Sequence, residues 1–174
     1  MKNLYLTVVI AATILLAASC NSNGNLQSNQ AHENHDSHLM KVGEQGDKAM
    51  GFSHEKTTHH FRLFADGGAI EVVANDAQDA ESRDQIRKHL SHIAGMFSEG
   101  NFDAPVLTHG KTPPGVPALQ QMKNQIGYKY EEIECGGRVR ISTVDKDALP
   151  AIYEFLRFQI SDHQTGDSIE VARE

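Results

Sequence analysis

Cysteine is scarce in this 174-residue chain, and so are the motifs that place cysteine or histidine around a metal or a haem. The two cysteines, Cys20 and Cys135, form no CxxC pair, and neither an HExxH nor a CxxCH motif occurs. The signatures of zinc fingers, zinc proteases and covalent haem attachment are therefore missing. If Cys20 carries a lipid, Cys135 has no partner for an intrachain disulfide, and stability must come from a hydrophobic core.

Basic residues are outnumbered by acidic ones. The chain holds 16 Lys and Arg against 23 Asp and Glu, which gives a net charge of −7. Such a chain offers no basic surface to neutralise phosphates, so we expect no nucleic-acid partner. An acidic domain is better suited to binding cations.

Long apolar runs are missing except at the N-terminus. The segment MKNLYLTVVIAATILLAASC has one basic residue, Lys2, and an apolar run from Leu4 to Ala18. This layout is typical of a secretory signal, and the run is short for a spanning helix. Its end, LAASC, resembles a bacterial lipoprotein signal, in which Cys20 becomes the lipid-bearing N-terminus. Plain secretion with cleavage nearby is the alternative.

Composition divides the chain into four parts. We expect residues 1–19 to be the signal and residues 20–49, rich in Asn, Ser, Gln and charged residues, to form a disordered tether. Regular apolar periodicity then predicts a single domain over residues 50–167, and residues 168–174 are expected to be a flexible tail. Removing the signal takes away only Lys2, so the charge of the mature chain becomes −8.

The pattern within the domain predicts an α+β fold. Residues 57–76 read as a β-hairpin whose turn contains Gly67 and Gly68, and residues 76–97 read as an amphipathic helix. A Pro- and Gly-rich connection over residues 104–117 leads to a short helix at 117–126, with Gly127 as its stop.

The second half of the domain repeats the first. Residues 128–145 again read as strand, double glycine and strand, and an apolar stripe ending at Ile160 predicts a closing helix. Aligning the glycine pairs places Phe61 on Tyr130, and a three-residue gap then places Leu90 on Leu156. We therefore expect two β-hairpin-plus-helix repeats that form a four-stranded antiparallel sheet with helices on one face.

Histidine and methionine gather at the entrance of the domain. Neutral imidazole suits copper and zinc, and thioether sulfur favours Cu(I). The candidate metal ligands are Met50, His54, His59 and His60, with His89 as a further candidate. His59 and His60 point to opposite faces if both lie in a strand. Either the strand begins after His60, or only one of the pair joins Met50 and His54.

The remaining histidines are weaker candidates. The tether could bind metal loosely through His32, His35, His38 and Met40. His89 lies at the border of the buried helix face, so it could approach His59 from above the sheet. His163 is expected at the surface, and His109 in a loop without an assigned partner.

Two phenylalanines of the closing helix lie away from its apolar stripe. Phe155 and Phe158 either pack inside the domain or form an exposed aromatic patch for a homodimer or another protein partner. An enzyme is the less favoured alternative, because Cys135 has no histidine near it in the sequence.

The segments MGFSHEKTTHHFRLFADGGAIEVVAND, SRDQIRKHLSHIAGMF, TPPGVP and EFLRFQISDHQTGD resemble a group of small exported bacterial proteins of unestablished role. Some members of that group carry the label aspartate carbamoyltransferase. That enzyme binds carbamoyl phosphate through a Ser-Thr-Arg-Thr loop, and the nearest triplet here, Glu81, Ser82 and Arg83, lies inside a predicted helix. The resemblance therefore implies a family and a motif but not this activity.

The sequence as a whole predicts a lipid-anchored protein of the cell envelope that faces the periplasm or the cell exterior. It is expected to bind a transition metal, preferably copper, for sequestration, delivery or tolerance. Zinc and noncovalent haem are less favoured ligands. A non-catalytic interaction module of the envelope is the alternative function.

Overall fold

The computed structural model describes residues 37, 40–44, 46–47 and 50–172. All of them belong to one compact unit that spans residues 35–174. The predicted signal segment, Cys20 and three of the tether histidines, His32, His35 and His38, lie outside the described residues. Among the described residues, no helix has the length and apolar character needed to span a membrane.

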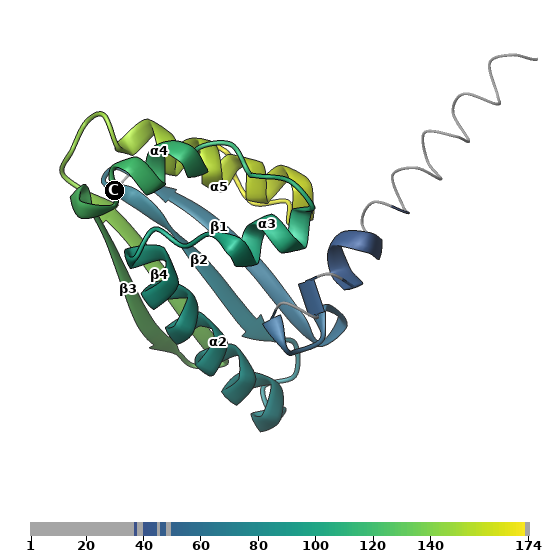
Figure 1. Cartoon of the computed structure of the whole chain (residues 1–174). Coiled ribbons are helices and arrows are strands. Elements are labelled where there is room, and N and C mark those ends of the chain that lie inside the picture. Colours follow the sequence, from purple (N-terminus) through teal and green to yellow (C-terminus); the bar gives the residue numbers. More distant parts are fainter. Residues whose placement is uncertain (1–36, 38–39, 45, 48–49, 173–174) are drawn as a thin grey trace, which may run out of the picture. The chain divides into compact units, whose positions relative to one another are not determined.

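The core of the unit is a four-stranded antiparallel sheet, in the order β1-β2-β4-β3. Its strands are β1 (Thr57–Phe64), β2 (Gly67–Ala74), β3 (Ile126–Ile133) and β4 (Gly136–Thr143). The helices are α2 (Ala80–Ser98), α3 (Asp103–His109), α4 (Val116–Gln121) and α5 (Leu149–His163), with short 3-10 turns η1 (His54–Lys56) and η2 (Lys123–Gln125). The helices cover one face of the sheet (Figure 1). The α+β prediction is confirmed.

The two halves are related by a pseudo-twofold axis that passes beside the pair Ile70 and Val139. These residues lie opposite each other on the central strands β2 and β4. On one side of them Gly68 pairs with Ile141, and on the other side Val72 pairs with Gly137. Gly68 corresponds to Gly137 in the repeat, and Ile141 corresponds to Val72. The pair Gly68–Ile141 is therefore equivalent to the pair Gly137–Val72, as a twofold relation requires.

Each helix packs on the hairpin of the other half. Helix α2 lies mainly on β3 and β4, whereas α5 lies on β1 and β2. A methyl group added to Gly68 would meet Leu156 Cδ1, and one added to Gly137 would meet Leu90 Cδ1. The two leucines therefore occupy equivalent positions over equivalent glycines, as the repeat predicted. All of the expected apolar stripe of α2 is buried, and it consists of Ile86, Leu90, Ile93 and Phe97.

Two connecting segments differ from the prediction. The Pro- and Gly-rich connection contains a helix, α3, that the sequence did not predict. Pro105 is compatible with it because it falls in the first turn, where a proline costs no hydrogen bond. Gly110 ends the helix with a φ of 65°. The helix expected at 117–126 is shorter. It ends at Gln121, and β3 begins at Ile126, so that Gly127 lies inside the strand rather than stopping a helix.

The ordered unit also extends beyond both predicted boundaries. Residues 40–44, which were expected to be disordered, are helical, and Val42 is buried. At the other end, the Ala172 N–H donates to Leu63 O, and Val171 packs against the core. The residues up to 172 therefore lie along the edge of β1 instead of forming a flexible tail, because they supply hydrogen bonds that an edge strand lacks.

The two phenylalanines of α5 have different environments. Phe155 is only 1% exposed and packs edge-on against Phe97 and Phe102. It is therefore part of the core and not available to a partner, which corrects the patch interpretation for this residue. Phe158 is partly buried, with His109 against its ring and Lys111 Nζ 4.9 Å from its centroid.

The close approach of α5 to β2 yields a stability prediction. Replacing Gly68 by Ala would place Cβ 2.2 Å from Leu156 Cδ1 and 2.3 Å from Arg62 O. The backbone oxygen cannot move aside cheaply, so the variant should lose about 2–3 kcal/mol of unfolding free energy in urea titrations. Gly95→Ala is the matched control, because Gly95 lies at an exposed position in the last turn of α2 with nothing near its added methyl group. This control should gain about 0.5–1 kcal/mol. Equal stability of the Gly68→Ala variant and the parent would contradict the packing.

Candidate functional site

The alternation of side chains along β1 separates the two adjacent histidines. His59 shares the helix-covered face with Phe61 and Leu63, whereas His60 lies on the opposite face. There the His60 Nδ1 atom lies 3.0 Å from Asp167 Oδ1, and Asp167 also accepts the Phe61 N–H. The strand begins at Thr57, before both histidines, so only His59 can contribute to a site beneath the helices.

His59 belongs to a cluster of three histidines from three elements. The rings of His59 and His163, at the end of α5, are nearly parallel, with centroids 5.7 Å apart. His89 comes from α2, and its ring and that of His59 both lie against Phe52, at centroid distances of 5.5 Å and 6.3 Å. We call His59, His89 and His163 the histidine cluster.

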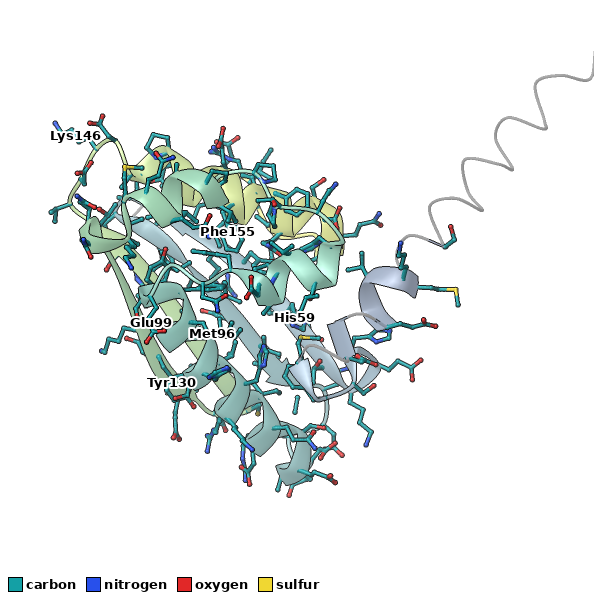
Figure 2. The ribbon with its side chains drawn as sticks, in the orientation of Figure 1. His59, Met96, Glu99, Tyr130, Lys146 and Phe155 are labelled. Carbon is teal, nitrogen blue, oxygen red and sulfur yellow. The ribbon has the colours of Figure 1, made fainter. Side chains whose placement is uncertain are left out.

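The histidine cluster lines a cavity of about 70 Å³ between the sheet and the helices. Met50 and residues of α3 contribute to the same wall, and Figure 2 shows His59 beside α3. Among the described residues, those that line this cavity include no Asp, Glu, Lys or Arg. The cavity therefore offers imidazole nitrogen and thioether sulfur in apolar surroundings, without a charged side chain.

Burial keeps all three imidazoles neutral near pH 7. It lowers the pKa of His59 from 6.5 to about 4, with smaller contributions from neighbouring histidines. Burial likewise lowers the pKa of His89 to about 4 and that of His163 to about 3. The physical cause is the loss of hydration, which penalises the imidazolium form. A neutral imidazole keeps a lone pair with which it can bind a metal.

The pseudo-twofold axis relates each residue of the histidine cluster to an equivalent residue of the other half. The equivalent residues show which side chains the fold accepts at these positions. The equivalents of His59, His89 and His163 are Tyr128, Phe155 and Phe97.

Those three aromatic rings pack together at the other end of the helical layer. The centroid of the Phe97 ring lies 5.7 Å from that of Tyr128 and 6.0 Å from that of Phe155. The equivalent positions are filled by aromatic rings at one end of the helical layer and by histidines at the other. The packing of the fold therefore does not require imidazole here.

A fourth histidine extends the wall. His109, at the end of α3, is buried, and its ring meets that of His163 edge-on at 4.9 Å. Its Nδ1 atom lies 2.6 Å from Asp162 Oδ2, and its Nε2 atom lies 2.9 Å from Gln159 Oε1. A histidine–carboxylate pair of this kind can act as a general base, but here the second nitrogen is already bonded. His109 therefore serves better as a support for the wall than as an acid–base group.

His54 lies outside the cavity, in an open groove. This groove, of about 510 Å³, is lined by Met40, His54 and Thr58, and it shares His59 and His163 with the cavity. The two histidines thus form a common wall, with the cavity on one side and the groove on the other.

The structure brings together only part of the predicted metal site. Met50, His59 and His89 line one cavity, as the sequence suggested, while His54 lies in the groove and His60 bonds to Asp167 on the far face. Sequence reasoning missed His163, which was expected at the surface. His163 follows Ile160 at helical spacing on the stripe that contains Leu156, so extending this stripe would have identified it.

The ligands are not yet arranged around an ion. Within the part of the chain that the structure describes, no group of three or more His, Cys, Asp or Glu side chains is placed so that it could hold a metal ion. Rotation of the imidazole rings about their side-chain torsions would be needed to bring their nitrogen atoms to one position.

The lowered pKa values predict how stability depends on pH. The unfolded chain takes up protons on these histidines below about pH 6.5, whereas the folded chain resists protonation down to pH 3 to 4. The unfolding free energy should therefore be fully present above pH 6.5 and fall steadily as the pH decreases toward 4. Urea titrations between pH 7.5 and 4.5 measure this slope.

The matched variant exchanges the histidine cluster for the aromatic residues found at the equivalent positions. This aromatic-swap variant carries His59→Tyr, His89→Phe and His163→Phe. It should fold, and its unfolding free energy should depend less on pH than that of the parent. His92→Gln, at an exposed position of α2, is the control and should change the slope much less, because the repulsion by His92 is a smaller cause of the low His89 pKa than desolvation. An unaltered slope in the aromatic-swap variant would show that the three imidazoles are not desolvated as described.

Comparison of the chain with known protein families, with curated proteins and with solved structures finds no match. The resemblance noted from the sequence therefore stays a prediction. The function has to be argued from the chemistry of the histidine cluster and its cavity.

Proposed function

We propose that the domain binds a single soft transition-metal ion, Cu(I) by preference, through the histidine cluster and Met50. The observation that supports this most strongly is the histidine-for-aromatic exchange at three equivalent positions of the two halves. Buried imidazoles lower the stability of a protein in mild acid, whereas phenylalanine at the same positions would not. Their presence is accounted for if they bind a ligand that needs neutral nitrogen donors.

The surroundings of the cluster favour Cu(I) over divalent metals. The described residues that line the cavity include no carboxylate that would compensate a double positive charge, and the cost of burying an ion rises steeply with its charge. Imidazole and thioether are ligands that Cu(I) accepts readily. Thioether is not among the usual ligands of zinc, which are Cys, His, Asp and Glu. Cu(I) also tolerates low coordination numbers, so two or three ligands from the cluster and Met50 suffice.

Haem fits the described cavity less well. Pockets for organic ligands of ordinary size enclose about 300–1,000 Å³, whereas this cavity offers about 70 Å³. A metal ion fits this space without any displacement of the core.

The role proposed for the metal site is sequestration or delivery in the cell envelope, with Cys20 as the lipid anchor. In this arrangement the segment of residues 20–39, with His32, His35 and His38, would connect the membrane to the domain and hold metal loosely. The ion would be stored or passed on rather than used in turnover.

A Cu(I) titration tests the site. Protein starting at residue 21, held under anaerobic conditions, should bind one tight Cu(I) per chain in competition with a chromogenic chelator. The aromatic-swap variant should lose at least about 100-fold in affinity, because it removes three donor nitrogens. His92→Gln should bind as the parent does, and zinc should bind more weakly than Cu(I). Undiminished Cu(I) affinity in the aromatic-swap variant would sink the proposal.

The anchor is tested separately in the native host. The parent chain should fractionate with membranes and incorporate labelled fatty acid, whereas Cys20→Ser should do neither, because no other residue of the LAASC segment carries a thiol. Cys135→Ser is the control and should remain lipid-labelled. Membrane fractionation and labelling of Cys20→Ser at the parental level would argue against a lipid on this residue.

A further inference from the structure

The groove on the outer side of the histidine cluster has donors of its own. Met40, on the helical segment before the domain, exposes 66% of its surface and lines this groove. His54 lines it as well, with 43% of its side chain exposed. The groove is also lined by His59 and His163, which line the inner cavity as well. A solvent-accessible thioether and imidazole therefore line the same groove as two histidines of the proposed metal site.

His54 is held in an orientation suited to metal binding. Asp47 Oδ1 accepts the backbone N–H of His54 at 2.7 Å and lies 2.9 Å from its Nδ1 atom. A carboxylate acceptor places the proton on Nδ1, which leaves the lone pair on Nε2. Carboxylates in this position commonly orient histidine ligands and make them more basic. Asp47 therefore acts as a positioning residue for His54.

A glycine makes room for this ring. A methyl group added to Gly43 would come within 2.8 Å of both Cε1 and Nε2 of His54. Any larger residue at this position would displace the imidazole from the groove. The helical segment thus contributes Met40 to the groove and, one turn later, an open surface against which His54 lies.

We propose that Met40 and His54 form an entry site that captures Cu(I) from solvent or from the tether and passes it to His59 and His163. This inference rests on the proposed function, since it names the route by which the inner site is loaded. The transfer is a ligand exchange: bonds from copper to the Met40 sulfur and His54 nitrogen are replaced by bonds to the wall histidines. The oxidation state of the copper does not change.

The loading kinetics of the protein starting at residue 21 test the entry site. The double variant Met40→Leu/His54→Gln removes both donors and keeps similar side-chain volumes. Mixing with a Cu(I)–chelator complex in a stopped-flow instrument should show loading at least about tenfold slower than in the parent, because the local supply of metal beside the wall is lost. The equilibrium affinity should stay within about twofold of the parental value, since the ligands of the inner site are intact.

Two further variants sharpen the test. Gly43→Ala keeps both donors but displaces the His54 ring, so it should also slow loading without a change in affinity. The aromatic-swap variant, which lacks the inner ligands, should still bind one Ag(I), a redox-inert substitute for Cu(I), with an affinity at least about 100-fold below that of the parent. This residual binding should disappear when Met40→Leu and His54→Gln are added.

The outcomes separate the two proposals. An unchanged loading rate in the double variant overturns the entry site and leaves the inner site intact. A loss of equilibrium affinity along with rate also overturns it, because Met40 and His54 would then be resident ligands. Failure of the parent to bind Cu(I) at all overturns the proposed function, and the entry role with it. That result is seen in the parental titration, before any variant is compared.

Discussion

The pairing of the two central strands is the constraint on which the rest of the unit depends. Strands β2 and β4 join the two hairpins into one sheet, and Gly68 and Gly137 let a helix lie close above each of them. Leu156 and Leu90 fill the space that a glycine leaves on the sheet surface. Each helix is thereby fixed over the opposite hairpin, so that neither half can bury its apolar surface without the other.

This arrangement creates two equivalent ends in the helical layer, and the chain uses them differently. At one end Phe97, Tyr128 and Phe155 close the space with aromatic rings. At the other end, histidines stand at the equivalent positions, and a small cavity remains open. The aromatic end thus serves as the structural reference for the histidine end. The difference between the two ends separates what the fold needs from what a ligand would need.

Solvation links the stability of the domain to the proposed chemistry. The low pKa values of the histidine cluster mean that the folded state excludes protons which the unfolded state accepts. The same exclusion keeps nitrogen lone pairs available near neutral pH. An uncharged, apolar cavity then favours an ion of single charge with soft ligands, and the exposed donors Met40 and His54 offer such an ion a path inward.

The amino-acid sequence by itself determined the hairpins, the repeat and the buried stripes of the helices, because periodicity and glycine turns are local properties of the chain. It also indicated Met50, His59 and His89 as neighbours. It could not assign His163 or separate His54 from His59, because the end of α5 meets β1 only through a contact between residues about a hundred positions apart. Only the tertiary structure decided which face each histidine occupies, since desolvation and ring contacts arise when α2, α5 and β1 pack together.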